Sequence, residues 1–357
     1  MSAEKRRPPI VGRYTREELS LASRNSGMPL EALRYDVTPA GLHYLLIHFD
    51  IPAADAATWK LRVDGLVSRP QVFSVAELRR RRAKTVRMTM ECAGNGRGQT
   101  APRYPSMPWL EEGVSTAEWT GVVLADLLDE AGVAKSAQEI VFHGTDRGID
   151  RGIEHGFSRS LTPSEALGGD VLVAYEMNGD PLLPQHGAPL RLVVPDWYGM
   201  ASVKWLERIE VIGRAFDGVQ QALSYRFRSV PGEKGVPCTR MRVNSLMAPP
   251  GIPDYYGRSR VVDAGPVEIL GRAWSGSGGI KRVEFSAGGD WQEAVLAAPV
   301  GAHAWRRWTA RWNAVPGAHE LRCRATDETG ATQPLDPPWD VTGFGNNAAQ
   351  RVEVEVR

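Results

Sequence analysis

The feature that most constrains the fold is a change of pattern at a proline- and glycine-rich segment, residues 229–253. Before it, from about residue 41, short alternating runs are mixed with runs of helical spacing. After it, alternating runs are separated only by turns such as Asp327-Glu328-Thr329-Gly330. Such alternation is typical of half-buried strands, and this spacing is typical of a sandwich. The sequence therefore predicts an α+β chain, with a mixed α/β domain followed by an all-β immunoglobulin-like sandwich.

The length of 357 residues favours two domains. Residues 1–40 are polar and interrupted by proline, which predicts an N-terminal arm that packs on the surface without a core of its own. We expect the first domain over residues 41–235 and the sandwich over 236–357. The linker between them would include Ala248-Pro249-Pro250-Gly251.

Several elements can be placed from periodicity and capping residues. Ser74 is expected to cap a short helix, and Leu124 to Ala131 should form a helix that ends at Gly132. Segment 148–158 is expected to be a glycine-interleaved loop. The predicted strands are 60–65, 84–90, 171–175, 190–194 and 209–212 in the first domain, and 266–270, 280–286, 319–325 and 351–356 in the sandwich.

Composition excludes some classes of function. A net charge of +1 argues against a nucleic-acid binder, whose affinity would come from neutralising phosphates. No apolar run approaches the roughly 20 residues that span a bilayer, so no membrane span is expected. Pro8-Pro9 follows the basic N-terminus where a signal peptide would need an apolar stretch. We therefore expect a cytoplasmic location, or a periplasmic one if an export leader has been removed.

The three cysteines, Cys92, Cys238 and Cys323, are far apart and show no CxxC spacing. Neither a disulfide framework nor a covalently attached haem is indicated. Cys323 falls in an apolar alternation, which predicts a thiol of the sandwich core, and Cys238 is assigned no role. In the sandwich, Trp305-Arg306-Arg307-Trp308 would place tryptophans in the core and arginines in solvent.

Cys92 differs from the other two because it leads from a strand-like run into Ala93-Gly94-Asn95-Gly96-Arg97-Gly98. Most lone cysteines are small buried hydrophobic residues. Three nearby glycines, however, permit a close backbone approach by a ligand, and Arg97 would favour an ionised thiol. This pattern favours a soft metal ligand.

A second group of candidates lies between residues 186 and 204. His186, Arg191 and Lys204 supply cationic or donor groups around one apolar strand pair, with Ser202 beside them. Such a combination suits a phosphate or another anion held partly out of water. The P-loop pattern is absent, and a zinc site from His143 and His155 would have too few ligands.

With these residues in place, the chain resembles the sulfite oxidase family of molybdenum-pterin enzymes, of the bacterial type without a haem domain. The resemblance covers nearly everything after about residue 40. The motifs that carry it are Glu91-Cys92-Ala93-Gly94-Asn95-Gly96-Arg97, Ala174-Tyr175-Glu176-Met177-Asn178-Gly179, His186-Gly187-Ala188-Pro189-Leu190-Arg191 and Val203-Lys204-Trp205-Leu206.

The resemblance implies a role for each matching residue. Cys92 would be the single protein ligand of molybdenum, beside the pterin dithiolene and oxo groups. Arg97, Trp109 and Tyr225 would form the substrate pocket. The residues that would hold molybdopterin and its phosphate are His48, His186, Arg191, Ser202 and Lys204. The sandwich would be a dimerisation domain, and a homodimer is implied.

Two departures from animal and plant sulfite oxidases affect the substrate. Leu46 and Thr342 stand where those enzymes carry arginines. Each lost charge-assisted hydrogen bond costs on the order of 1.5–3 kcal/mol of anion binding. The resemblance thus implies the cofactor more strongly than it implies sulfite.

The expected function is molybdenum-dependent oxo transfer, with sulfite oxidised to sulfate and electrons passed to a separate acceptor such as a c-type cytochrome. The substrate would be a small anion or another oxo acceptor. Alternatives with the same cofactor are reduction of an S-oxide, an N-oxide or nitrate. From other classes, the alternatives are a hydrolase or transferase with Cys92 as nucleophile and His48, His143 or His155 as base, and a non-catalytic module that binds through the sandwich tryptophans.

Overall fold

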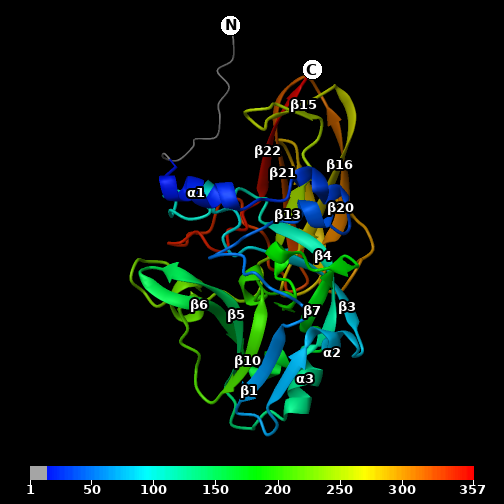
Figure 1. Ribbon diagram of the computed structural model, residues 1–357. Helices are drawn as coiled ribbons and strands as arrows, with labels where there is room; N and C mark the ends of the chain where they lie inside the picture. Colours follow the sequence, from blue (N-terminus) through cyan, green and yellow to red (C-terminus); the bar gives the residue numbers. More distant parts are fainter. Residues whose placement is uncertain (1–13) are drawn as a thin grey trace.

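Strands dominate both halves of the chain in the computed structural model, which describes residues 14–357 (Figure 1). The first 13 residues of the predicted arm lie outside this range. The helices are short, and capping residues or glycines mark several of their ends. Ser74 and Glu77 form a reciprocal capping box, and Gly132 ends a helix with φ of 71°. The helices are α1 (Arg16–Arg24), α2 (Val75–Arg79), α3 (Leu124–Ala131) and α4 (Pro163–Ala166).

Two sheets form the first half of the molecule. One has the order β2-β1-β10-β5-β6, in which β1 and β10 are parallel. Its strands are β1 (Lys60–Gly65), β2 (Gln71–Ser74), β5 (Glu139–Asp150), β6 (Ile153–Leu161) and β10 (Leu206–Ile212). The other has the order β3-β4-β7-β8, with β9 paired to β7. Its strands are β3 (Lys84–Glu91), β4 (Val114–Val123), β7 (Leu172–Met177), β8 (Asp180–Pro181) and β9 (Arg191–Val193).

The second half is the predicted sandwich, which stands above the first half in Figure 1. One sheet has the order β13-β16-β20-β19 and the other β14-β15-β22-β21-β17-β18. The strands are β13 (Asn244–Met247), β14 (Ile252–Pro253), β15 (Arg260–Val262), β16 (Gly265–Trp274), β17 (Ile280–Ser286), β18 (Gln292–Glu293), β19 (Val295–Leu296), β20 (Arg306–Ala314), β21 (Gly317–Asp327) and β22 (Gln350–Val356). Trp308 and Cys323 are buried in its core, whereas Arg307 is exposed, as the alternation predicts.

The N-terminal segment differs from the predicted surface arm. Met28 and Leu33 are fully buried in the core of the first half. Arg272 of β16 donates to the Leu33 carbonyl at 2.7 Å, so the segment also joins the two halves. The polar composition of residues 1–40 hid this because only a few apolar side chains make the contact.

Two loop predictions are wrong. Residues 148–158 belong to a long hairpin, β5 and β6, in which Ile149 pairs with Glu154. Within the predicted linker, β13 is buried along its whole length, and β11 (Arg226–Phe227) pairs with β12 (Val236–Pro237) across the expected 235/236 boundary. Glycines and prolines mark turns correctly here, but the intervening strands are too short to show an alternation.

Candidate active site

Cys92 lies at the end of β3, where the strand turns into the glycine-rich loop. Its backbone N–H donates to the Gly113 carbonyl at 2.8 Å, and the Asn95 N–H donates back to the Cys92 carbonyl at 2.9 Å. Gly96 adopts φ of 78°, which favours glycine because it has no Cβ. This turn fixes the thiol at the point where β3 leaves the sheet.

A buried carboxyl group next to Cys92 holds the glycine-rich loop in place. Glu91 Oε1 accepts hydrogen bonds from Asn95 at 3.1 Å and Asn244 at 3.0 Å, and its Oε2 accepts one from the Trp274 indole at 3.0 Å. Burial raises the pKa of Glu91 to about 7, although these three donors oppose the rise. Asn244 and Trp274 belong to the sandwich, so the second half of the chain also positions Cys92.

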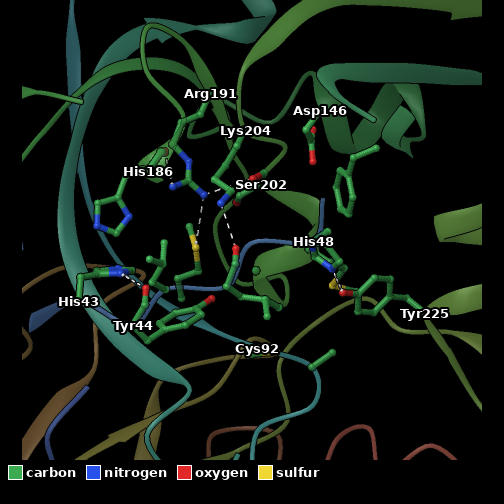
Figure 2. A pocket seen from close by; sticks show the side chains of 17 residues that line it. His43, Tyr44, His48, Cys92, Asp146, His186, Arg191, Ser202, Lys204 and Tyr225 are labelled. Atoms are coloured by element: carbon green, nitrogen blue, oxygen red, sulfur yellow. Dashed lines mark hydrogen bonds between the residues drawn. The ribbon is translucent and has the colours of Figure 1, made fainter. Parts of the chain in front are cut away.

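Cys92 lines a pocket that is open to solvent on one side (Figure 2). The pocket gathers seven of the nine predicted site residues from distant parts of the sequence. They are His48, Cys92, His186, Arg191, Ser202, Lys204 and Tyr225. The two cationic side chains and the His48–Tyr225 pair lie on different sides of the space that Cys92 faces.

One wall of the pocket is cationic. Arg191 donates to the carbonyls of His186 at 2.9 Å and Ser202 at 3.2 Å, and Lys204 Nζ donates to the Leu46 carbonyl at 3.0 Å. The Ser202 hydroxyl accepts from the Val194 N–H at 3.1 Å, which fixes the turn. Burial lowers the pKa of Lys204 to about 7 and that of Arg191 to about 10. Apart from Asp146 near Lys204, the groups that hold these cations are neutral, which leaves positive charge for an anionic ligand.

These residues fit a pterin with a phosphate. Arg191 Nε and His43 Nε2 are buried without a hydrogen-bond partner among the described residues, so donors or acceptors remain for a bound group. Residues 14–357 contain no group of three or more His, Cys, Asp and Glu side chains that could hold a metal ion. A metal in this pocket would therefore draw most of its ligands from the cofactor, with Cys92 as the thiolate.

The opposite wall contains a short polar contact. His48 Nε2 lies 2.5 Å from the Tyr225 hydroxyl oxygen. Burial lowers the pKa of His48 to about 3, so the imidazole is neutral, and burial raises the pKa of Tyr225 well above its usual value. Both groups are therefore uncharged near neutral pH. The phenol keeps its proton and can donate it in a hydrogen bond.

Arg97 and Trp109, the other two predicted site residues, are buried beside the cysteine loop and are absent from the pocket lining. Arg97 Nε donates to the Thr342 carbonyl at 2.6 Å. Burial raises the pKa of the Cys92 thiol, while the Gly94 backbone, the nearby Arg97 guanidinium and the Trp109 indole oppose that rise. The two residues therefore influence the pKa of the thiol without lining the pocket.

Sequence reasoning missed four residues of the site. His43 and Tyr44 line the pocket, as does Asp146, which lies near Lys204. Phe344 stacks on the Tyr225 ring with centroids 5.2 Å apart. His43 and Tyr44 lie in the same short run as His48, and this proximity is the one signal in the sequence. Phe344 comes from the second half of the chain, and no local pattern connects it with Tyr225.

Two family models match the chain. Residues 48–220 match the oxidoreductase molybdopterin binding domain, and residues 237–357 match the Mo-co oxidoreductase dimerisation domain. The chain is 33% identical to a sulfite oxidase of Gallus gallus, over 88% of this chain and 72% of that protein. The chain belongs to the sulfite oxidase family. It is an oxidoreductase whose cofactor is molybdenum bound to molybdopterin.

Other relatives carry different names. A nitrate reductase [NAD(P)H] of Hordeum vulgare is 33% identical over 93% of this chain, but the match spans only 41% of that protein. The crystal structure of the sulfane dehydrogenase SoxCD from Paracoccus pantotrophus superimposes with a TM-score of 0.83 at 27% identity, covering 97% of this chain and 88% of that one. The family is therefore certain, whereas relatives differ in the substrate that their names give.

The comparisons also bear on assembly. The dimerisation domain over residues 237–357 supports the expected homodimer. Among the residues that the structure describes, no helix is long and apolar enough to cross a membrane.

Proposed function

We propose that this protein oxidises sulfite to sulfate at molybdenum and passes two electrons, one at a time, to a separate acceptor. The observation that carries the proposal is the pocket in which Cys92 faces a cationic wall on one side and the neutral His48–Tyr225 pair on the other. The names of the chicken relative and of the SoxCD structure support a sulfur substrate.

The bound cofactor supplies the redox chemistry and the oxygen atom that is transferred. Cys92 would bind the metal, and Arg191, Lys204, His186 and Ser202 would hold the pterin and its phosphate. Their buried positions exclude water and strengthen each charge-assisted contact.

The His48–Tyr225 pair would handle hydrogen bonding at the reacting oxygen. In the neutral tautomer that carries its hydrogen on Nε2, His48 would donate to the Tyr225 oxygen and leave the phenolic hydrogen free to point into the pocket. A phenol that stays protonated can then donate to an oxygen of the substrate or product without adding negative charge.

The hydrolase alternative has little support from the geometry. His143 pairs with Glu210 at 3.0 Å, and His155 lies 2.9 Å from the Gln220 side chain. His48 is engaged with Tyr225, so none of the three candidate bases is hydrogen-bonded to the thiol. Burial also raises the pKa of Cys92, which disfavours a free thiolate nucleophile.

The proposal is tested by supplying molybdenum-loaded protein with sulfite and a one-electron acceptor, either ferricyanide or a c-type cytochrome. We expect sulfate to form with two acceptor equivalents per sulfite. Tyr225→Phe should lower kcat about tenfold or more, because one hydrogen bond in the transition state is lost. Fully loaded enzyme that ignores sulfite but reduces nitrate with a reduced dye would overturn the proposal.

A further inference from the structure

Four side chains from four separate segments form one stack beside the pocket. The Arg97 guanidinium carbon lies 4.8 Å from the Phe344 ring centroid, and Phe344 stacks on Tyr225 at 5.2 Å with 24° between the planes. The Arg159 guanidinium carbon lies 5.8 Å from the Tyr225 ring centroid. We call this arrangement the Arg97–Phe344–Tyr225–Arg159 stack. It joins the cysteine loop to a segment of the sandwich half.

Within the stack, two hydrogen bonds to backbone carbonyls hold the Arg97 guanidinium in place. Its Nε donates to the Thr342 carbonyl at 2.6 Å and its Nη1 lies 3.4 Å from the Met107 carbonyl. The guanidinium also packs on Gly94, where an added Cβ would lie 2.8 Å from its terminal atoms. Only Nη2 has no hydrogen bond to a described residue. Three of the five N–H groups of Arg97 therefore have no described partner, but the side chain does not line the pocket and does not present them to a substrate there.

The turn that carries Phe344 is built to keep Arg97 in this position. Asp340 Oδ1 accepts hydrogen bonds from the backbone N–H groups of Thr342 at 2.9 Å and Phe344 at 3.0 Å. Gly343, with φ of 68°, packs against the Arg97 side chain, where a Cβ would come within 2.8 Å. The turn thus aims the Thr342 carbonyl at the guanidinium and lays the Phe344 ring over it.

Arg159 gives the stack its second charged end. It is 2% exposed and donates to the Gln220 carbonyl at 2.6 Å, while no described carboxylate lies within ion-pair distance. The Tyr225 ring thus contacts both Phe344 and a cation, and these contacts restrict the position of the phenol. The Tyr225 hydroxyl is thereby held against His48.

We propose that Phe344 is a specificity-determining residue that clamps Arg97 away from the substrate pocket. Together with Leu46, which lines the pocket where the family resemblance predicts an arginine, the clamp leaves the substrate side poor in available cations. The pocket then favours sulfur substrates of low negative charge, such as hydrogen sulfite or an organic sulfur centre, over dianions such as sulfate. This inference rests on the proposed function for its substrate class.

The test uses Phe344→Val, Arg97→Met and the double variant, all loaded with molybdenum. Two measurements are made on each: inhibition of sulfite oxidation by sulfate, and the change in Tm caused by low millimolar sulfate. We expect Phe344→Val to bind sulfate about tenfold more tightly, with the effect on KM for sulfite rather than on kcat. Arg97→Met should abolish that gain in the double variant and change sulfate binding less than threefold by itself.

Phe285→Val is the matched control, because Phe285 is fully buried in the sandwich core. It should lose stability without any gain in sulfate binding. Unchanged sulfate binding in Phe344→Val, or a gain that persists in the double variant, would overturn the clamp. The Tm measurement needs no turnover, so absence of sulfite oxidation would count against the proposed function alone.

Discussion

Buried arginines at the contact between the two halves differ from those around the pocket in what neutralises them. At the contact, Arg260 pairs with Glu31 and Arg272 pairs with Asp36, each at 2.6 Å. Around the pocket, Arg97, Arg159 and Arg191 donate only to backbone carbonyls or sulfur, and no described carboxylate lies within ion-pair distance.

The difference separates charges that join the two halves from charges that are buried without a carboxylate partner. An unpaired buried cation is costly, and a carboxylate beside it would reduce that cost. At the contact between the halves, that is the arrangement found. At the pocket, a carboxylate beside Arg191 would also compete with an anionic cofactor, and the fold holds this cation with neutral acceptors. We infer that the pocket's positive charge is completed by the cofactor.

The largest expected effect is at the pocket. Arg191→Met should lower the pterin content of purified protein at least tenfold, because a buried charge-assisted contact to phosphate is worth about 1.5–3 kcal/mol. Stability of the cofactor-free protein should fall less than in the matched variant Arg272→Met, because removing an unpaired buried cation offsets the loss of the donor to the His186 and Ser202 carbonyls. Pterin content is measured by fluorescence of the released, oxidised cofactor. Wild-type pterin content in this variant would contradict the inference that Arg191 is held for the cofactor.

The matched substitution at the contact between the halves should do the reverse. Arg272→Met leaves Asp36 and the carbonyls of Leu33 and Arg34 without their donor. The free energy of unfolding should fall by about 1–3 kcal/mol, as expected for a buried acceptor left unsatisfied. Urea unfolding checks this. Pterin content per folded molecule should stay at the wild-type level.

The pocket and the contact between the halves should also respond oppositely to pH. Lys204 has its pKa lowered from 10.5 to about 7 in the folded chain, so between pH 7.5 and 9.5 the unfolded chain binds more protons. Stability due to this group therefore rises with pH, by about 1 kcal/mol per pH unit. In cofactor-free protein, the stability of the wild type should therefore increase relative to that of Lys204→Met as pH rises over this range. Parallel pH profiles for the two proteins would contradict the assignment.

His303, at the contact between the halves, should show the opposite slope. It lies 2.9 Å from Asp196 and 3.0 Å from Asp170, whose hydrogen bonds raise its pKa above 6.5. Its contribution to stability is complete below pH 6.5 and is lost as pH rises through the folded pKa. His303→Gln should cost about 1 kcal/mol at pH 6, and the cost should shrink by pH 9. A cost that is constant with pH would mean that the charge is unimportant.

Much of this arrangement follows from local sequence. Alternation predicts β3, β17 and β22 nearly to the residue. Ser74 marks the start of α2, and Gly132 marks the end of α3. Seven of the nine predicted site residues line one pocket, and four of them, Cys92, His186, Arg191 and Lys204, belong to the quoted motifs. Each of these four lies beside the end of a buried strand or in a turn next to one.

Other features depend on contacts between distant segments. Phe344 covers Arg97, 247 positions earlier in the chain, and Arg159 reaches Tyr225 from β6. Only the packing of the sandwich half against the cysteine loop brings the first pair together. The prediction that Arg97 lies in the substrate pocket placed it in the right loop, but could not show that Phe344 and Thr342 engage its side chain.

The central claim is that Cys92 is the protein's ligand in a pocket completed by molybdopterin. The most direct measurement is X-ray absorption at the molybdenum edge, which counts sulfur ligands, on wild type, Cys92→Ser and the core-thiol control Cys323→Ser. We predict three sulfur ligands in the wild type and the control, and two in Cys92→Ser, one serine oxygen replacing the thiolate. The same sulfur count in all three proteins would contradict the claim.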